Sequence, residues 1–222
     1  MVVAAGRGER LGSPYPKAFA KLGGRPLLAE SLERLDRSDW IEGLVVVVPS
    51  EWEEPAILLA EEVGAGKVTL AVPGGETRSD SVRAGLAEVP GEAAVVVVHD
   101  AARPLDDRLV DERVVLALED GWDGAVPAMP VPDTLKRAEG EAVVETVDRS
   151  GLVAVQTPQA FVAGTLRRAL EAGGAESDCA ASVERAGGRV RVVPGDPRLV
   201  KVTSDADLAL VEALLGGDRG DE

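Results

Sequence analysis

Residues 2–11 read Val2-Val3-Ala4-Ala5-Gly6-Arg7-Gly8-Glu9-Arg10-Leu11, and Pro16-Lys17 follows within the same loop. An apolar pair therefore runs straight into a bend of small residues. Glycine reaches backbone dihedral angles that other residues avoid, so such a bend lets the main chain approach a ligand closely. The small residues are Ala4, Ala5, Gly6 and Gly8. They predict a strand that leads directly into a ligand-binding loop.

Two positive charges stand in this loop. Arg10 offers a planar fork of donors to phosphate oxygens, and Lys17 offers a mobile point charge. A pair so placed suits several phosphates of one polyphosphate, which indicates a nucleoside triphosphate as the ligand. Taken alone, the segment also reads as an ordinary turn between a strand and a loop.

Two better-known phosphate loops do not fit the segment. A P-loop needs Gly-Lys-Ser or Gly-Lys-Thr after its glycines, and neither follows here. The dinucleotide fingerprint needs a third glycine at position 11, which is Leu11, and it has no use for Arg10. The sequence therefore indicates a nucleotide loop of another kind.

The 222 residues are enough for one sizeable core, and we expect a single domain over residues 1–222. The 39 acidic residues outnumber the 24 basic ones, which gives a formal charge of −15. This balance argues against general binding to nucleic acid or to an anionic membrane. The single cysteine, Cys179, excludes an intramolecular disulfide, and no apolar run is long enough to span a bilayer. We expect a cytoplasmic protein.

Valine-rich runs alternate with segments of helical periodicity. Strands are predicted at 2–3, 44–48, 68–72, 93–98, 124–127 and 190–193, and helices at 27–35, 55–63, 80–88, 109–118, 163–172, 180–186 and 205–215. Continuous valine runs are typical of strands buried on both faces. The pattern predicts an α/β fold with an open, mostly parallel sheet flanked by helices, and such sheets bind ligands at the carboxyl ends of their strands.

The alternation breaks between about residues 133 and 155. Thr134-Leu135-Lys136-Arg137 and residues 143–147 read as two strands of a hairpin that turns at Gly140. An isolated hairpin is only marginally stable, so this one must pack on something, and a symmetry-related copy of the chain would supply the surface. We expect a β-arm that mediates dimerisation.

Two more loops follow predicted strands. Gly74-Gly75-Glu76-Thr77-Arg78-Ser79-Asp80-Ser81 opens a helix, whose free amides favour an anionic or carbonyl ligand, although helix capping alone also explains it. His99-Asp100-Ala101-Ala102-Arg103-Pro104 places a carboxylate at the end of a strand. Asp100 is the metal candidate, because one carboxylate with phosphate oxygens and water suits Mg²⁺. His99 is either a general base or, as is commoner for a lone histidine, a structural residue.

Three single residues complete the polar set. Lys201 is one of only five lysines and interrupts an apolar segment, Val200-Lys201-Val202-Thr203, where it needs an anionic partner or a route to solvent. Arg149 closes the stretch Thr146-Val147-Asp148-Arg149, and Thr157 lies in Gln156-Thr157-Pro158-Gln159.

Together these loops resemble those of the 2-C-methyl-D-erythritol 4-phosphate cytidylyltransferase family of the non-mevalonate isoprenoid pathway. The resemblance covers nearly the whole chain and rests on the motifs quoted above, which occur in order, with Asp133-Thr134-Leu135-Lys136-Arg137 in the arm. It implies a Rossmann-like α/β fold with a protruding β-arm. It also implies a Mg²⁺-dependent homodimer that joins CTP to methylerythritol phosphate and releases pyrophosphate.

The resemblance implies roles for particular residues. Arg10 and Lys17 would stabilise the charge on the α-phosphate and on the leaving pyrophosphate, and Lys201 would help place the attacking phosphate. Thr134 and Arg149 would bind the acceptor from the partner's arm, with Arg149 also counted as catalytic. Asp100 would hold the metal. The CTP-binding residues would be Ala4, Ala5, Gly6, Gly8, Gly75, Glu76 and Ser81, and the acceptor site would include Asp100, Ala101, Arg103 and Thr157.

Three alternatives stay open. A ribitol 5-phosphate cytidylyltransferase would share the nucleotide loops and differ in the acceptor pocket. A sugar-1-phosphate nucleotidylyltransferase would share the fold but usually carries a longer glycine loop. A non-catalytic nucleotide-binding module would keep the glycine loops without needing Arg10, Lys17 and Lys201 together.

Overall fold

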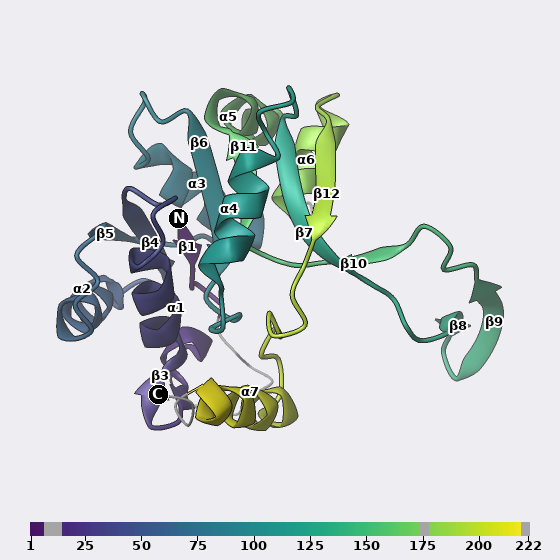
Figure 1. Cartoon of the computed structure of the whole chain (residues 1–222), viewed down its shortest axis with the longest axis horizontal. Helices are drawn as coiled ribbons and strands as arrows, with labels where there is room; N and C mark the ends of the chain where they lie inside the picture. The colour runs from purple at the N-terminus through teal and green to yellow at the C-terminus, as the bar shows by residue number, and fades with distance from the viewer. Residues whose placement is uncertain (7–14, 174–177, 219–222) are drawn as a thin grey trace.

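The protein is a mixed α/β sheet with helices on both faces and one long projection (Figure 1). Its computed structural model describes residues 1–6, 15–173 and 178–218. The main sheet has the strand order β10-β7-β11-β6-β1-β4-β5, and β12 pairs with β7. Its strands are β1 (Val2–Val3), β4 (Leu44–Val48), β5 (Val68–Pro73), β6 (Val95–Asp100), β7 (Gly124–Pro130), β10 (Val153–Val155), β11 (Gln159–Val162) and β12 (Val190–Pro194).

Most neighbouring strands run parallel, which confirms the predicted class of sheet. β1 pairs in parallel with both β4 and β6, β4 with β5, and β12 with β7. β11 was not predicted, and it runs antiparallel between β6 and β7. The chain leaves the carboxyl end of β7 for the projection and returns near the same end. The strands that follow, β10 and β11, therefore both run antiparallel to β7.

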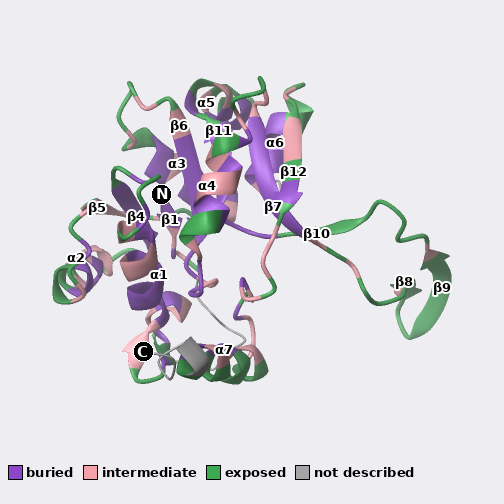
Figure 2. Cartoon of the chain, viewed as in Figure 1, coloured by how far each residue is buried: buried purple, intermediate pink, exposed green. Residues whose placement is uncertain are grey.

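Two layers of helices cover the sheet because its strands alternate their side chains between the faces. Val46 and Val48 join a core with α1 (Leu27–Asp36), α2 (Glu53–Glu62) and α4 (Arg108–Leu116). Val47 points to the opposite core, built with α3 (Arg78–Ala87), α5 (Ala163–Glu171) and α6 (Cys179–Arg185). Figure 2 shows β4, β6 and β7 between these layers as mostly buried, whereas β5 and β12 are largely intermediate or exposed.

A third, smaller core lies beyond the carboxyl end of β1. There the helix α7 (Asp205–Asp218) packs on the short hairpin of β2 (Lys21–Leu22) and β3 (Arg25–Pro26). Leu22, Val202 and Val211 are fully buried in this core. The packing fixes the segment just before α7, and this segment carries Lys201.

The projection is the predicted hairpin. Its strands β8 (Leu135–Glu139) and β9 (Ala142–Val147) pair antiparallel and stand away from the rest of the chain (Figures 1 and 2). The side chains of Val143 and Val144 are 63% and 50% exposed there. Residues 153–155 of the segment expected to form the arm are β10, which pairs with β7 in the main sheet.

The remaining predicted strands and helices are present, with shifts of a few residues at their ends. Within the described part of the chain, we find no helix that is both long and apolar enough to cross a membrane.

Candidate active site

A cavity of about 590 Å³ opens at the carboxyl ends of β1, β5 and β6. This is the edge at which the sequence predicted ligand binding. Four segments far apart in the chain meet there, and the described residues that line the cavity are Val3, Ala4, Ala5, Gly6, Lys17, Ala18, Gly75, Glu76, Thr77, Arg78, Ser81, Asp100, Ala101, Ala102, Lys201 and Thr203.

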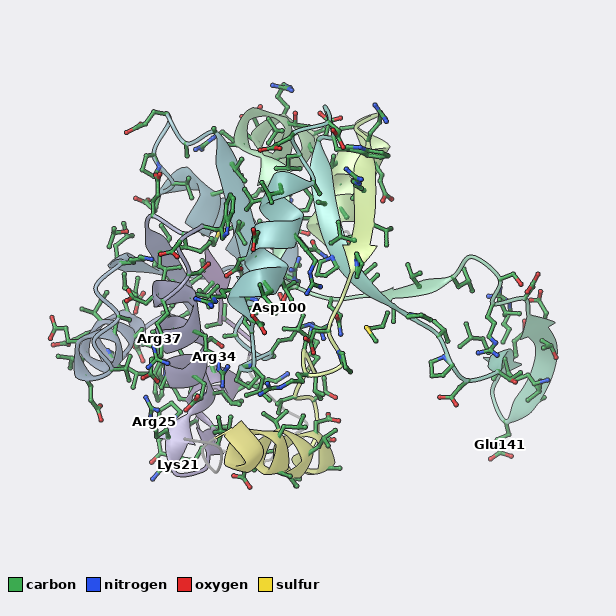
Figure 3. All side chains as sticks on the ribbon, in the orientation of Figure 1. Lys21, Arg25, Arg34, Arg37, Asp100 and Glu141 are labelled. Carbon is green, nitrogen blue, oxygen red and sulfur yellow. The ribbon has the colours of Figure 1, made fainter. Side chains whose placement is uncertain are left out.

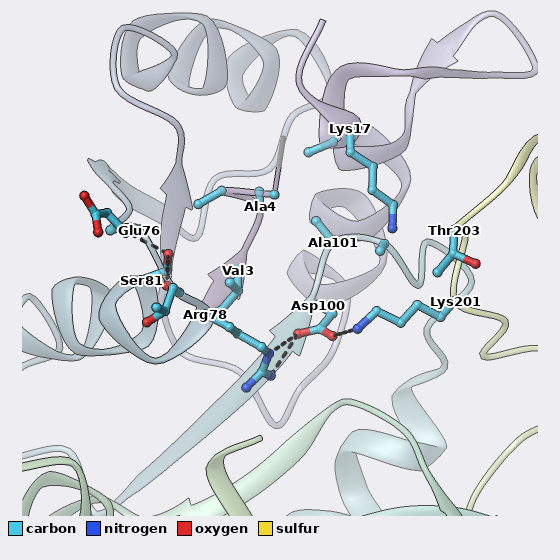
Figure 4. A pocket seen from close by; sticks show the side chains of 16 residues that line it. Val3, Ala4, Lys17, Glu76, Arg78, Ser81, Asp100, Ala101, Lys201 and Thr203 are labelled. Atoms are coloured by element: carbon cyan, nitrogen blue, oxygen red, sulfur yellow. Dashed lines mark hydrogen bonds and ion pairs between the residues drawn. The ribbon is translucent and has the colours of Figure 1, made fainter. Parts of the chain in front are cut away.

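The segment after β1 forms one wall. The amide of Ala4 donates to the carbonyl of Val47 at 2.7 Å, which holds the bend against the sheet. The amide of Lys17 donates to the carbonyl of Gly6 at 3.3 Å, so the two ends of the intervening loop lie side by side. Lys17 begins the short helix η2 (Lys17–Phe19), and its side chain points into the cavity (Figure 4). Gly8 and Arg10, both predicted site residues, lie outside the described residues.

The aromatic ring of Phe19 packs on Trp52, with ring centroids 4.4 Å apart. Trp52 immediately precedes α2, which packs on the sheet. This contact therefore anchors η2, and with it the backbone of Lys17, to the main body of the protein.

The loop before α3 forms the opposite wall. Thr77 and Asp80 make a reciprocal capping box, so capping is one function of this motif. The Ser81 hydroxyl accepts from the Gly75 amide at 3.2 Å and donates to the Thr77 carbonyl at 3.0 Å. A Cβ atom on Gly75 would lie 2.2 Å from the Cβ of Asp80, so the tight loop needs glycine there. The structure thus confirms the capping role of this loop, and ligand binding by the loop stays a prediction, with Gly75 and Ser81 among the residues that line the cavity.

Asp100, the last residue of β6, lies at the centre of the cavity between two cations (Figure 4). Its Oδ1 accepts from Nε and Nη2 of Arg78 at 3.2 and 2.9 Å. Its Oδ2 accepts from Nζ of Lys201 at 2.7 Å. Arg78 and Lys201 therefore gather positive charge around one carboxylate, and Lys17 adds a third cation to the same cavity, in a protein whose net charge is strongly negative.

The two cations control the charge of Asp100. Burial favours the neutral carboxyl, but the neighbouring charges of Arg78 and Lys201 outweigh it and hold the pKa of Asp100 well below its ordinary value. Asp100 is therefore an anion throughout the physiological range. It is an acceptor for cations and cannot serve as a general acid.

Thr157 and His99 lie beneath Asp100 instead of lining the cavity. The Asp100 amide donates to Oγ1 of Thr157 at 3.0 Å, and both Thr157 and His99 are buried. Burial lowers the pKa of His99 to about 4, so its ring is neutral at pH 7. One ring nitrogen lies 3.0 Å from the carbonyl of Arg103. These contacts favour the structural reading of His99.

Arg103 also supports the site from outside the lining. Its guanidinium donates to the carbonyls of Leu199 and Val155. The Val202 amide donates to the carbonyl of Ala102 at 2.8 Å. These bonds join the loop after β6 to the segment that carries Lys201, and so bring Lys201 within reach of Asp100.

The two predicted acceptor residues of the arm are remote from the cavity of their own chain. Thr134 and Arg149 are exposed near the hairpin, and Arg149 donates to the carbonyls of Val131 and Pro132. Figure 3 shows the two regions well apart, with Asp100 at the carboxyl end of the central strand β6 and Glu141 at the tip of the arm.

Arg78 lines the cavity and contacts Asp100 but was not among the predicted site residues, although its motif was predicted as a loop that binds a ligand. Thr77, Thr203, Ala18 and Ala102 line the cavity as well. The signal for Arg78 was its place at the first position of a helix that follows a glycine loop. Among the described residues, no group of three or more His, Cys, Asp or Glu side chains gathers to hold a metal.

Comparison with known proteins identifies the architecture. The family model described as 2-C-methyl-D-erythritol 4-phosphate cytidylyltransferase (IspD) matches residues 1–217. The protein of that name from Nocardia farcinica is 44% identical over 216 residues, which are 97% of this chain and 92% of the relative. Its namesake from Rubrobacter xylanophilus is 44% identical over 220 residues, 97% of this chain and 93% of the relative.

Solved structures agree. The 2-C-methyl-D-erythritol 4-phosphate cytidylyltransferase from Thermus thermophilus is 35% identical, with a TM-score of 0.79 over 96% of each chain. The 4-diphosphocytidyl-2C-methyl-D-erythritol synthase from Anaerococcus prevotii is 26% identical, with a TM-score of 0.83 over 97% of this chain and 94% of that chain. From its loops, its fold and these matches, the chain belongs to the 2-C-methyl-D-erythritol 4-phosphate cytidylyltransferase family.

Proposed function

We infer that this chain transfers the cytidylyl group of CTP to 2-C-methyl-D-erythritol 4-phosphate, giving 4-diphosphocytidyl-2-C-methyl-D-erythritol and pyrophosphate. The observation that carries this inference is that Lys17, Arg78, Lys201 and Asp100 line one cavity walled by two small-residue loops, with Arg78 and Lys201 bonded to Asp100. Family membership indicates which reaction the chain performs, and the cavity supplies the positive charges that a reaction between phosphates needs.

The reaction brings two anions together. A phosphate oxygen of the acceptor attacks the α-phosphorus of CTP in line, and the bond to the leaving pyrophosphate breaks. A phosphate monoester is already a nucleophile, so the protein mainly positions the reactants and neutralises their charge. Lys17, with Arg10 from the same loop, stabilises the α-phosphate and the leaving group, while Lys201 orients the attacking phosphate. No general base is needed, which agrees with a neutral, buried His99.

The nucleoside half of CTP binds between the two loops. Ala4, Ala5 and Gly6 present backbone groups on one side, and Gly75, Glu76 and Ser81 lie on the other. The hydroxyl of Ser81 already braces its own loop, so its contribution is to hold the Gly75 amide in place. Backbone walls of this kind accept cytosine and exclude the larger purines.

Asp100 fits one Mg²⁺ that is held chiefly by phosphate. Its carboxylate has about four lone-pair sites, of which Arg78 and Lys201 occupy three, so Oδ2 keeps one acceptor site. Mg²⁺ in phosphate sites takes one or two carboxylates and keeps several waters. When bound, Mg²⁺ would neutralise phosphate charge. We propose Asp100 as its protein ligand.

We further propose a homodimer in which the arm of one chain reaches the cavity of its partner. The support is geometric: neither Thr134 nor Arg149 lines the cavity of its own chain, the arm stands away from the sheet, and it exposes Val143 and Val144. In the dimer, Thr134 and Arg149 bind the acceptor phosphate from the partner's side, and Arg103 and Thr157 support the same half of the site from within the chain. A cytoplasmic location is part of the proposal, and the free, buried thiol of Cys179 is consistent with a reducing compartment.

The test is pyrophosphate release from CTP with 2-C-methyl-D-erythritol 4-phosphate as Mg²⁺ is titrated. Parallel reactions replace the acceptor with ribitol 5-phosphate and replace CTP with ATP, GTP or UTP. We expect release only with CTP and methylerythritol phosphate, and only with the metal present. Preference for ribitol 5-phosphate would overturn the acceptor, and CTP binding without release in any pairing would indicate a non-catalytic module.

A further inference from the structure

Arg78 lines the cavity, but the proposed reaction assigns it no role. It is the first residue of α3, its side chain is 24% exposed, and it reaches across the cavity floor to Asp100 (Figure 4). Two of its nitrogens, Nε and Nη2, donate to the same oxygen, Oδ1. The third, Nη1, lies 3.6 Å from Sγ of the buried Cys179. All three guanidinium nitrogens therefore have partners within the protein.

The two cations that hold Asp100 differ in rigidity. Arg78 belongs to a helix whose N-terminus is closed by a capping box and which packs on β1, β4 and β5. Lys201 lies in a segment without regular secondary structure, and its side chain is 42% exposed. A planar guanidinium bound at three atoms is also more restricted than a lysine ammonium on a flexible chain. Arg78 is thus the fixed partner of Asp100, and Lys201 is the exchangeable one.

The proposed reaction requires such an exchange. Lys201 contacts Asp100 at 2.7 Å in the ligand-free cavity, and it must turn towards the acceptor phosphate when the substrates bind. Without a second cation, the Asp100 carboxylate would be free to follow Lys201 and would compete with phosphate for it. With Oδ1 held by Arg78, the carboxylate stays at the end of β6 while Oδ2 is released.

We propose that Arg78 is a positioning residue that fixes the Asp100 carboxylate. Lys201 can then turn to the acceptor phosphate and leave Oδ2 of Asp100 free, while the carboxylate itself stays in place. This inference rests on the proposed function, because it assigns Arg78 a part in that same reaction. Arg78 acts through Asp100 and not by direct contact with phosphate. It also ties the α3 loop, on the nucleoside side of the cavity, to β6 on the phosphate side.

The kinetic test compares Arg78→Gln, Arg78→Lys, Asp100→Asn and the double variant Arg78→Gln/Asp100→Asn. Arg83→Gln is the matched control, since it removes an equal charge from the same helix at a residue that does not line the cavity. We expect Arg78→Gln to lower kcat about 10- to 100-fold, the size of effect that misplacement of a reacting group by about 1 Å produces. KM for CTP should change far less, because Arg78 does not bind the nucleotide.

The remaining outcomes separate positioning from direct contact. Arg78→Lys should recover only part of kcat, because lysine keeps the charge but loses the two-point hold on Oδ1. The double variant should be no slower than Asp100→Asn, since Arg78 has nothing to act through once the carboxylate is gone. If the loss of kcat in the double variant equals the product of the losses in the two single variants, the proposal is overturned, and Arg78 must touch substrate. An unchanged kcat in Arg78→Gln would overturn it as well.

A crystal structure of the Arg78→Gln variant decides the same point without using activity. We expect the Asp100 carboxylate to have left its position beside α3, while the rest of the fold superposes on the wild type. A carboxylate that stays in place would refute the proposal, even if the wild-type protein released no pyrophosphate. If the wild-type protein releases no pyrophosphate in the assay, the proposed function is refuted instead. If Arg78→Gln fails to fold, the structure of Arg78→Lys serves, with the loss of one of the two bonds to Oδ1 expected.

Discussion

A mixture of two inactive variants should recover activity if the arm completes the partner's active site. We choose Lys201→Ala, which damages the cavity, and Arg149→Ala, which damages the arm. No described residue between 131 and 155 lines the cavity of its own chain, whereas Lys201 contacts Asp100 there. In a shared-site dimer, each active site therefore takes Lys201 from one chain and Arg149 from the other.

The expected recovery follows from this geometry. Each variant alone should lose about 10²- to 10³-fold in kcat, as for other donors that stabilise transition-state charge. After complete exchange of an equal mixture, about half of the dimers are mixed, and in these one site carries both substitutions while the other carries neither. The mixture should therefore show about one quarter of the wild-type rate per chain.

The assay is pyrophosphate release before and after subunit exchange, with exchange measured by native mass spectrometry of chains that carry different tags. Lys201→Ala mixed with Asp100→Asn is the control. Both substitutions lie in the same cavity, so no exchange can create an intact site. A mixture of Lys201→Ala with Arg149→Ala that stays inactive despite demonstrated exchange would refute the shared site. Absence of any dimer in the native mass spectrum would refute the assembly itself.

Three further predictions concern single residues. Gly74→Ala should raise KM for CTP about tenfold or more, because its Cβ would lie 2.4 Å from the Cβ of Ala5 in the opposite wall of the proposed nucleotide site; an unchanged KM would show that the walls adapt. Burial raises the pKa of the Cys179 thiol to about 11, so iodoacetamide at pH 8 should label it only after unfolding, and rapid labelling of the native protein would contradict this burial. Burial also raises the pKa of Asp106 and Asp111, so the folded protein keeps protons on these two carboxyls that the unfolded chain releases, and their contribution to stability should fall as the pH rises from about 4 through about 6. Urea unfolding at pH 8 should therefore find Asp111→Asn more stable than the wild type by roughly 1–3 kcal/mol, the scale of one to two pKa units, and a less stable variant would contradict the argument.

The periodicity of the sequence was enough to predict most of the sheet and its helices. Runs such as Leu44–Val48 are buried on both faces, as their unbroken apolar character predicted. The glycine loops could be recognised as well, because a bend of small residues after a strand is, like the periodicity, a property of a few consecutive residues. Since parallel strands align their carboxyl ends, these loops could also be expected at one edge of the sheet.

Other features depend on which segments become neighbours, and local sequence does not record that. The direction of β11 follows from where the arm leaves and rejoins the sheet. Thr157 lies 57 positions from Asp100 and Lys201 lies 101 positions from it, yet each is bonded to it. Arg78 stands 22 positions before Asp100, and only the packing of α3 on β1, the neighbour of β6, turns an arginine in a capping motif into the partner of the central carboxylate. Short-range patterns were therefore enough to establish the class of fold and the loops predicted to bind nucleotide. The arrangement of charges around Asp100 could not be predicted in the same way, because it depends on contacts between distant segments that form only in the folded chain.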